Sequence, residues 1–283
     1  MKLTNFRPVF IIGAARSGTK LLRDTIARHP DIDKVPYDVN YIWRMGNQET
    51  AHDELTTHSV TSEVKAKIRH QLKKYHRGNA VLIEKTVSNC LRIPFVNAIY
   101  PNAHFIHLIR DGYDVIESSY RQWTASPDWR YILKKASTYP ITIAPSYAFK
   151  YLMTIGNKMI STQGQPHSTW GPVYDGMQDD LTQLTLLEVC AMQWQKCVLH
   201  PFNTLKSIPS ERVITVRYAD FVQSPKQILG DITEFIGGDD SAYQQMDFSE
   251  IHPNNVGKGF KRFGPKEADV ISKYVEFINQ EIN

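Results

Sequence analysis

Cysteine is scarce in this sequence. Three cysteines occur in 283 residues, Cys90, Cys190 and Cys197, and none of them belongs to a Cys-x-x-Cys motif. Three thiols cannot all pair with one another, so a disulfide framework is not expected. We therefore predict reduced thiols in the core of a cytoplasmic protein.

Clustered metal ligands are also missing. His104 and His107 are close in the sequence, but residues three apart on a strand point to opposite faces of the sheet. We therefore expect no zinc and no other metal cofactor.

The sequence lacks long apolar runs and strong charge. No run approaches the roughly 18 residues that span a membrane, and the apolar stretch after Arg7 is too short for a signal peptide. The net charge is +4, and Lys and Arg form no dense tract. We expect no transmembrane segment and no nucleic-acid partner, whereas the mild positive charge suits an anionic ligand.

The first clear pattern is a strand, a tight turn and a helix over residues 8–29. An apolar run ends at Gly13, and after Gly18 apolar residues keep a helical spacing as far as Pro30. The unpaired N–H groups and the dipole at the start of such a helix stabilise an anion. The pattern predicts a phosphate or sulfate site, with a glycine turn that binds no ligand as the alternative.

The spacing of Gly13 and Gly18 is that of a nucleoside-triphosphate P-loop. That loop needs Lys directly after the second glycine, followed by Ser or Thr for magnesium. Here the order is Gly18-Thr19-Lys20, so the lysine comes one place late and the magnesium hydroxyl is missing. Ordinary ATP or GTP chemistry is therefore disfavoured.

Buried strands alternate with helices along much of the chain. Further strands are predicted at 80–83, 104–109 and 212–216, and polar residues follow each of them. This alternation favours an α/β fold, a parallel sheet flanked by helices whose ligands bind at the carboxyl ends of the strands. A helix that starts after Ser224 as N-cap and stops at Gly237 is expected to be scaffold.

Residues 120–184 interrupt the alternation. We predict a single domain over 1–283 in which 120–184 form an irregular, aromatic-rich cap that shapes an acceptor pocket, with a packed structural excursion as the alternative. The aromatic residues of this segment include Trp123, Trp129, Tyr139, Tyr147, Trp170 and Tyr174.

Two motifs resemble those of sulfotransferases that use 3′-phosphoadenosine 5′-phosphosulfate (PAPS). One is similar to their 5′-phosphosulfate loop, whose usual last residue is Thr, and consists of Arg16, Ser17, Gly18, Thr19 and Lys20. The other resembles their 3′-phosphate motif, in which a strand-end arginine and a serine eight residues later hold the phosphate; Arg110 and Ser118 have this spacing. The resemblance implies the P-loop-like sulfotransferase fold.

Three weaker blocks extend the resemblance. Glu84-Lys85-Thr86 is similar to a block of prokaryotic sulfotransferases, in which Lys85 would be aimed at the transferred sulfuryl group. A histidine base is excluded at the following position, which is Val87. By the same resemblance Tyr218 would border the adenine, and Lys258 would belong to a basic loop that closes over the cofactor.

The resemblance implies transfer of a sulfuryl group from PAPS to a hydroxyl group, with adenosine 3′,5′-bisphosphate as product and no metal. Arg16, Lys20 and Lys85 would stabilise the charge on the leaving phosphate. The general base is left open between Asp38, near the place of the glutamate base in tyrosylprotein sulfotransferases, and Glu84.

The acceptor is expected to be a carbohydrate or glycolipid precursor, because an aromatic cap suits stacking on sugar faces. Lipid, phenol and peptide acceptors stay open. A nucleotide-binding P-loop protein without catalysis and a small-molecule kinase are the alternatives, and the missing magnesium hydroxyl after Gly18 argues against both.

Overall fold

The computed structural model describes residues 6–125 and 169–282. Five strands of these residues form a parallel sheet in the order β2-β3-β1-β4-β5. The strands are β1 (Arg7–Ile12), β2 (Ile32–Lys34), β3 (Val81–Glu84), β4 (His104–Ile109) and β5 (Val213–Arg217). The predicted α/β fold with a parallel sheet flanked by helices is confirmed.

The helices of the described residues are α1 (Thr19–Ile26), α2 (Asn40–Trp43), α3 (Ser62–Lys73), α4 (Ile93–Ile99), α5 (Gly112–Thr124), α8 (Met177–Gln183), α9 (Leu186–Leu205), α10 (Tyr218–Gln223), α11 (Pro225–Phe235), α12 (Ser241–Gln244), α13 (Lys258–Arg262) and α14 (Pro265–Ile282). Short 3₁₀ turns are η1 (Thr57–Ser59), η2 (Val87–Leu91), η3 (Ser210–Arg212) and η4 (Pro253–Asn255). Within the ranges 6–125 and 169–282, no helix is long and apolar enough to cross a membrane.

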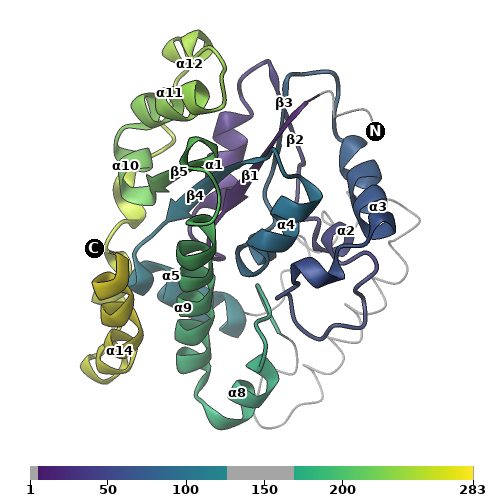
Figure 1. Cartoon of the computed structure of the whole chain (residues 1–283). Coiled ribbons are helices and arrows are strands. Elements are labelled where there is room, and N and C mark those ends of the chain that lie inside the picture. The colour runs from purple at the N-terminus through teal and green to yellow at the C-terminus, as the bar shows by residue number, and fades with distance from the viewer. Residues whose placement is uncertain (1–5, 126–168, 283) are drawn as a thin grey trace. The chain divides into compact units, whose positions relative to one another are not determined.

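Alternating side chains of β1 pack on both faces of the sheet. Val9 and Ile11 join a core with the apolar residues of α1, α10 and α11, whereas Phe10 contacts the rings of Trp43 and Phe105 on the other face. Figure 1 shows α4 and α9 on the near side of the sheet. Both faces are covered, which explains why the strands are almost continuously apolar.

The strand order creates a switch point between β1 and β4. These two strands are neighbours, with Ile12 opposite His107. The chain leaves β1 toward β2 at one edge and leaves β4 toward β5 at the other edge. Loops that diverge in this way open a crevice at the carboxyl ends of the strands, where ligands of open α/β sheets bind.

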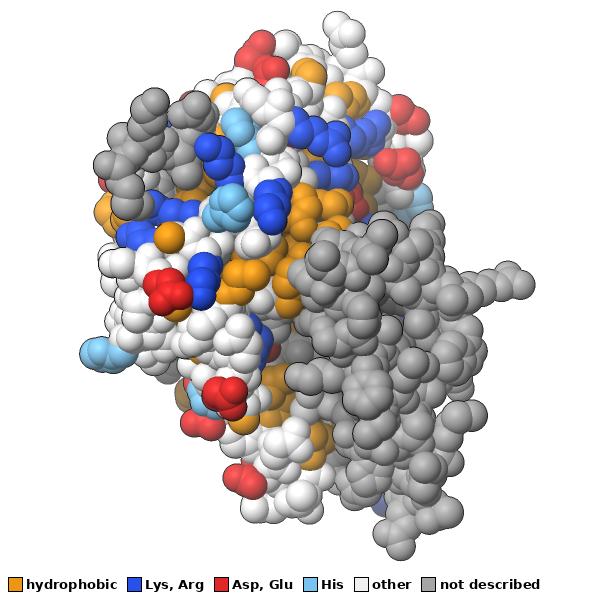
Figure 2. Space-filling model, turned by 90° about the vertical axis from the view of Figure 1, so that its right-hand side faces the viewer, with side chains coloured by type: hydrophobic (Ala, Val, Ile, Leu, Met, Phe, Trp, Pro, Cys, Tyr) orange, Lys and Arg blue, Asp and Glu red, His pale blue; other side chains and the backbone are white. Residues whose placement is uncertain are grey.

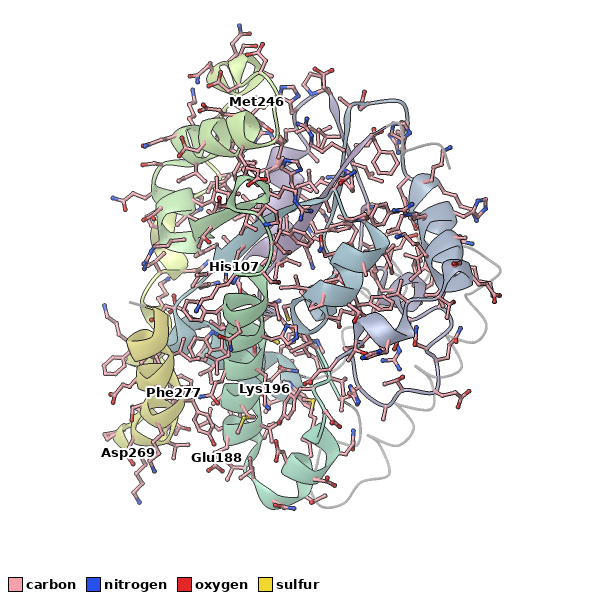
Figure 3. The ribbon with its side chains drawn as sticks, viewed as in Figure 1. His107, Glu188, Lys196, Met246, Asp269 and Phe277 are labelled. Carbon is pink, nitrogen blue, oxygen red and sulfur yellow. The ribbon has the colours of Figure 1, made fainter. Side chains whose placement is uncertain are left out.

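His107 and the three cysteines are buried, whereas His104 is partly buried. His104 packs against Phe235 of α11, while His107, labelled in Figure 3, is buried on the same strand. Burial lowers the pKa of His107 to about 4, so its ring is neutral at pH 7. As predicted, the thiols of Cys90, Cys190 and Cys197 are free and buried.

The predicted cap at Ser224 is wrong, the predicted helix stop at Gly237 is confirmed, and strand β2 was not predicted. Residues 32–34 form the edge strand β2, which is too short for a periodic pattern to reveal. Helix α11 begins after Ser224, but the serine side chain makes no capping hydrogen bond. Gly237 does follow the helix end with φ 71°, a conformation that favours glycine.

Two basic side chains of α3 bind the end of α4. Lys65 Nζ and Arg69 Nε donate to the carbonyl oxygens of Ala98 and Ile99, at the last turn of α4, at 2.8 Å each. Carbonyls at a helix end lack intrahelical partners, so these bonds stabilise the end of α4. Figure 2 faces the side of the molecule where α3 lies, with Lys and Arg side chains spread among uncharged ones.

The chain divides into two compact units, residues 1–119 with 171–283, and residues 120–170. The sheet belongs to the first unit. Most of the predicted cap at 120–184 falls on residues 126–168, outside the described residues. Its described ends are partly helical rather than irregular, because α5 runs to Thr124 and α8 spans Met177–Gln183.

Candidate functional site

The turn after β1 is tightly packed. Gly18 has φ 95°, and a Cβ atom at this position would lie 2.5 Å from the ring of Tyr218. At Gly13 a Cβ atom would lie 2.7 Å from the carbonyl oxygen of Leu108 on β4. Ser17 and Thr19 are buried. Gly18 is therefore favoured by its backbone conformation and by the close approach of Tyr218, whereas Gly13 is favoured by the close approach of β4 alone.

The start of α1 leaves N–H groups for a ligand. The first N–H within the helix that bonds back is that of Leu22, which donates to the Gly18 carbonyl at 3.0 Å. The N–H groups of Thr19, Lys20 and Leu21 precede it and have no helical carbonyl to reach. This is the geometry expected of an anion site at a helix N-terminus.

Arg16 connects the two predicted phosphate motifs. Its backbone has φ 70°, an uncommon conformation for a residue other than glycine. Its Nε donates to Ser118 Oγ at 2.9 Å, and its carbonyl oxygen accepts from Arg110 Nη1 at 3.1 Å. The turn after β1 and the segment after β4 therefore meet at the switch point.

Arg110 is held on several sides. Its guanidinium lies 4.4 Å from the centre of the Tyr218 ring, and Nη2 donates to the Asn255 carbonyl at 2.8 Å. Nη2 also lies 3.5 Å from Asp114 Oδ2. Its Nε is buried and has no hydrogen-bond partner. The predicted adenine-side tyrosine and the predicted 3′-phosphate arginine are thus neighbours.

The predicted closing loop forms the short helix α13, with Gly257 as its N-cap, and is fixed to α5 through its backbone. Asp114 accepts hydrogen bonds from the N–H groups of Gly257 at 3.0 Å and Gly259 at 2.7 Å. A Cβ atom at position 259 would lie 2.2 Å from the Tyr113 carbonyl oxygen. Lys258 is exposed between these two anchors. The loop therefore borders the site by backbone contacts, with its lysine at the surface.

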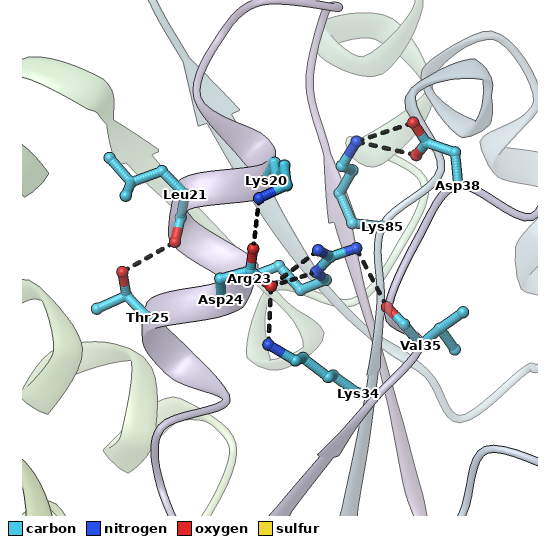
Figure 4. A network of polar contacts seen from close by, with 9 residues as sticks. All are labelled: Lys20, Leu21, Arg23, Asp24, Thr25, Lys34, Val35, Asp38 and Lys85. Atoms are coloured by element: carbon cyan, nitrogen blue, oxygen red, sulfur yellow. Dashed lines mark hydrogen bonds and ion pairs between the residues drawn. The ribbon is translucent and has the colours of Figure 1, made fainter. Parts of the chain in front are cut away.

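Asp38 and Lys85 form an ion pair. Lys85 Nζ donates to Asp38 Oδ1 at 2.9 Å and to Oδ2 at 3.1 Å, as drawn in Figure 4. The lysine side chain is 8% exposed and the aspartate side chain 39%. The carboxylate therefore stays accessible to a substrate hydroxyl, while the lysine lies behind it at the end of β3.

Glu84, the other carboxylate considered as a base, is 2% exposed. One carboxylate oxygen accepts from the hydroxyl of Thr86, and the other accepts from Asn89 Nδ2 at 3.0 Å. Burial raises the pKa of Glu84 to about 7, even though the Thr86 hydrogen bond lowers it. This carboxyl group lies beneath the Asp38–Lys85 pair in the protein interior.

Lys20 lies along α1 instead of over the turn. Its Nζ donates to Asp24 Oδ2 at 2.9 Å, and the side chain is 76% exposed (Figure 4). Among the described residues, no group of three or more His, Cys, Asp or Glu side chains is placed to hold a metal ion.

Sequence reasoning missed Arg23. Its side chain is buried, and Nη1 donates to the Val35 carbonyl at 3.2 Å, which ties α1 to the segment leading to Asp38. The sequence does place Arg23 between Leu22 and Ile26, on the apolar side of α1. A charged side chain buried at such a position needs a polar partner, so this position could have indicated a structural role.

A cavity of about 820 Å³ lies away from these residues. It is lined by Arg7, Ala80, Pro101 and neighbouring residues, at the amino ends of the strands. Ligands of parallel sheets bind at the opposite edge. We therefore place the candidate site at the carboxyl ends, where the predicted residues gather.

Comparison with known proteins identifies relatives in sequence and in fold. The model of the sulfotransferase family matches residues 8–163. A Caenorhabditis briggsae protein whose name proposes protein-tyrosine sulfotransfer is 30% identical over 126 residues, which are 41% of this chain and 44% of that protein. The chain spans 29% and 44% of the lengths of the curated relatives that it matches.

Solved structures share the fold at low identity. A sulfotransferase of Mycobacterium avium has a TM-score of 0.53 and 11% identity, with 97% of this chain and 77% of that chain covered. A sulfotransferase of Alicyclobacillus acidocaldarius has a TM-score of 0.50 and 16% identity, with 98% and 97% covered. By the family match and the fold, the chain belongs to the sulfotransferase family.

Proposed function

We propose that the protein transfers a sulfuryl group from PAPS to a hydroxyl group and releases adenosine 3′,5′-bisphosphate. The observation that carries the proposal is the 2.9 Å hydrogen bond between Arg16 and Ser118, residues 102 positions apart. It brings a residue of the 5′-phosphosulfate motif next to a residue of the 3′-phosphate motif. The two motifs must lie close together if one nucleotide is to bind both. A cytoplasmic location stays a prediction.

The residues at the switch point fit this donor. Arg110 and Ser118 would hold the 3′-phosphate through charge-assisted hydrogen bonds, with Arg16 between the two phosphate positions. The free N–H groups at the start of α1 would bind the 5′-phosphate. Tyr218, whose ring supports Arg110, would border the adenine.

Asp38 and Lys85 would carry the chemical step. Asp38 takes the proton from the acceptor hydroxyl, whose oxygen bonds to sulfur while the bond from sulfur to the leaving phosphate oxygen breaks. Lys85 lies within hydrogen-bond distance of Asp38 and would neutralise charge on the sulfuryl and phosphate oxygens. Lys20 could join only by leaving Asp24.

The acceptor in this proposal is a carbohydrate or glycolipid hydroxyl, which aromatic residues of 120–184 would stack against. Trp123 and Tyr174 are buried and are not among these residues. Most of those residues lie outside the described part of the chain. A tyrosine hydroxyl is the second candidate, because the Caenorhabditis briggsae relative is named for protein-tyrosine sulfotransfer.

Ligand-induced thermal stabilisation tests the donor. Adenosine 3′,5′-bisphosphate without magnesium should stabilise the protein by about 2.7 kcal/mol at 100 times its dissociation constant. ATP and GTP with magnesium serve as comparison ligands. Stabilisation by magnesium-ATP alone would contradict the proposal and favour a kinase.

A further inference from the structure

A ring of buried polar groups lies behind the Asp38–Lys85 pair. The N–H of Val39 donates to Thr86 Oγ1 at 3.0 Å, and the Thr86 hydroxyl donates to Glu84 Oε1. Glu84 Oε2 accepts from Asn89 Nδ2 at 3.0 Å. The ring so far joins the end of β3, the η2 turn and the segment before α2.

Arg92 and Asn40 close the ring. Arg92 Nε donates to Asn89 Oδ1 at 2.9 Å, and its Nη2 donates to Asn40 Oδ1 at 2.5 Å. Asn40 follows Val39 in the chain, so the hydrogen bonds return to the segment where they began. Glu84, Thr86, Asn89 and Arg92 are each at most 2% exposed.

Ionisable groups of opposite sign lie in the ring and beside it. Arg92 carries the positive charge opposite Glu84, and its Nη1 lies 3.7 Å from Asp53 Oδ1. Asp53 is buried as well and accepts from Asn40 Nδ2 at 3.0 Å and from Arg44 Nη1 at 3.1 Å. Arg92 Nη1 is buried without a hydrogen-bond partner, whereas the contacts given above pair the other polar atoms of the ring. Breaking one of these hydrogen bonds would leave a further unpaired group in a medium of low dielectric, which favours a rigid ring.

The ring touches both partners of the ion pair through the backbone. Asp38 directly precedes Val39, and Lys85 stands between Glu84 and Thr86. The ring therefore fixes the peptide next to the carboxylate and the two peptides that flank the lysine. Across these two backbone segments, Lys85 Nζ lies 2.9 and 3.1 Å from the carboxylate oxygens of Asp38.

We infer that this ring is a positioning device for the Asp38–Lys85 pair, with Glu84 and Thr86 acting through the pair instead of touching substrate. Both oxygens of Glu84 are occupied by donors, and the carboxyl group is buried, which separates it from an acceptor. The inference deepens the proposed function and rests on it for the catalytic meaning of the pair. The geometry of the ring can be tested without any sulfuryl acceptor.

Amine labelling of Lys85 tests the geometry directly. Acetic anhydride is applied to the folded protein, and the labelling rate of each lysine is measured by mass spectrometry. Thr86→Val keeps the side-chain shape but loses the hydroxyl, so Lys85 should label at least about 5-fold faster than in the wild type. Thr86→Ser should restore the slow rate.

Thr233→Val is the matched control. Thr233 is 1% exposed, and its hydroxyl donates to the Leu229 carbonyl within α11, away from the ring. This variant loses a buried hydroxyl of the same kind, but Lys85 should keep its wild-type rate. An unchanged Lys85 rate in Thr86→Val, with the protein folded, would overturn the positioning role.

Turnover separates positioning from general destabilisation. With labelled PAPS and 4-nitrophenol or a tyrosine peptide as acceptor probe, Thr86→Val should lose at least about 10-fold in kcat while bisphosphate affinity changes less than 3-fold. Thr86→Ser should recover kcat. If labelling follows the expected pattern but wild-type protein does not bind the bisphosphate, the ring stands and the proposed function fails.

Discussion

At the scale of single residues, Arg110 contacts three residues of the candidate nucleotide site. Arg110→Ala removes the guanidinium that reaches Arg16, Asn255 and the Tyr218 ring. We expect bisphosphate affinity to fall by about 1.5–3 kcal/mol, or roughly 10- to 150-fold, as for a lost charged hydrogen bond. Calorimetric titration measures the change.

Two variants calibrate that result. Ser118→Ala should lose less affinity, because it removes one neutral hydroxyl. Arg28→Ala removes an arginine that pairs with Glu250 at the surface, away from the switch point, and should bind as the wild type does. Wild-type affinity in Arg110→Ala would show that the 3′-phosphate is held elsewhere.

Asp38 should affect chemistry more than binding. Asp38→Asn keeps the size of the side chain but loses the base, so we expect turnover to fall by about 10²- to 10⁴-fold with near-normal bisphosphate affinity. Lys85→Ala should lower turnover and PAPS affinity together, because its charge meets the bound sulfuryl group and the transition state. Steady-state kinetics and titration on both variants give the comparison.

If Asp38→Asn keeps turnover within threefold of the wild type, Asp38 is not the general base. Of the two candidate bases, Asp38 and Glu84, Asp38 is the accessible one, because its side chain is partly exposed where it contacts Lys85. Glu84 is a poor replacement, since substrate cannot reach it without disrupting the buried ring.

Glu84 should make stability depend on pH. Burial raises its pKa from 4.5 to about 7 in the folded protein, with further effects from Thr86, Asp38 and Lys85. Between these values the folded state holds a proton that the unfolded state releases. This contribution to stability is therefore full below about pH 4.5 and is lost as pH rises toward 7.

Glu84→Gln should remove that dependence. Urea unfolding of both proteins between pH 4.5 and 8 should give a stability difference that changes with pH by up to about 1.4 kcal/mol per unit. The difference between the two proteins is used because His107 also makes stability depend on pH. Burial lowers the pKa of His107 to about 4, so its contribution to stability changes with pH in the opposite direction. A difference that is constant across this range would contradict the raised pKa.

At the scale of elements, the contact of helix α13 with α5 depends on Gly259. Gly259→Ala would force a Cβ atom to 2.2 Å from the Tyr113 carbonyl oxygen, so α13 must move away from α5. We expect a loss of about 1–3 kcal/mol in stability, as for overpacking, and weaker bisphosphate binding because Asn255 approaches Arg110 from the preceding turn. Thermal unfolding and titration measure both effects.

Gly257 provides the matched control for this element. It has φ 70°, and no atom lies within 4 Å of a Cβ built there. Asn tolerates this conformation better than most residues, so Gly257→Asn should change stability and affinity little. Equal effects in the two variants would mean that crowding against Tyr113 is not what places the loop.

At the scale of the whole molecule, the sequence predicted some elements of the fold and the candidate site but not others. The apolar runs and the glycine spacing predicted β1, its turn and α1, because strand and helix periodicity are local properties of the sequence. The edge strand β2 could not be predicted in this way, since its three residues are defined by pairing with β3.

Which residues are available at the carboxyl ends of the strands follows from the sequence, because a parallel sheet gathers at one edge the residues that follow its strands. How these residues pair depends on the packed fold. Arg16 reaches Ser118, Lys85 meets Asp38, and Lys20 bonds to Asp24 along α1. The first two contacts join segments far apart in the chain, and the third is one of several contacts open to a long, exposed side chain. Distances of this kind follow from packing against neighbouring elements, which no local pattern encodes.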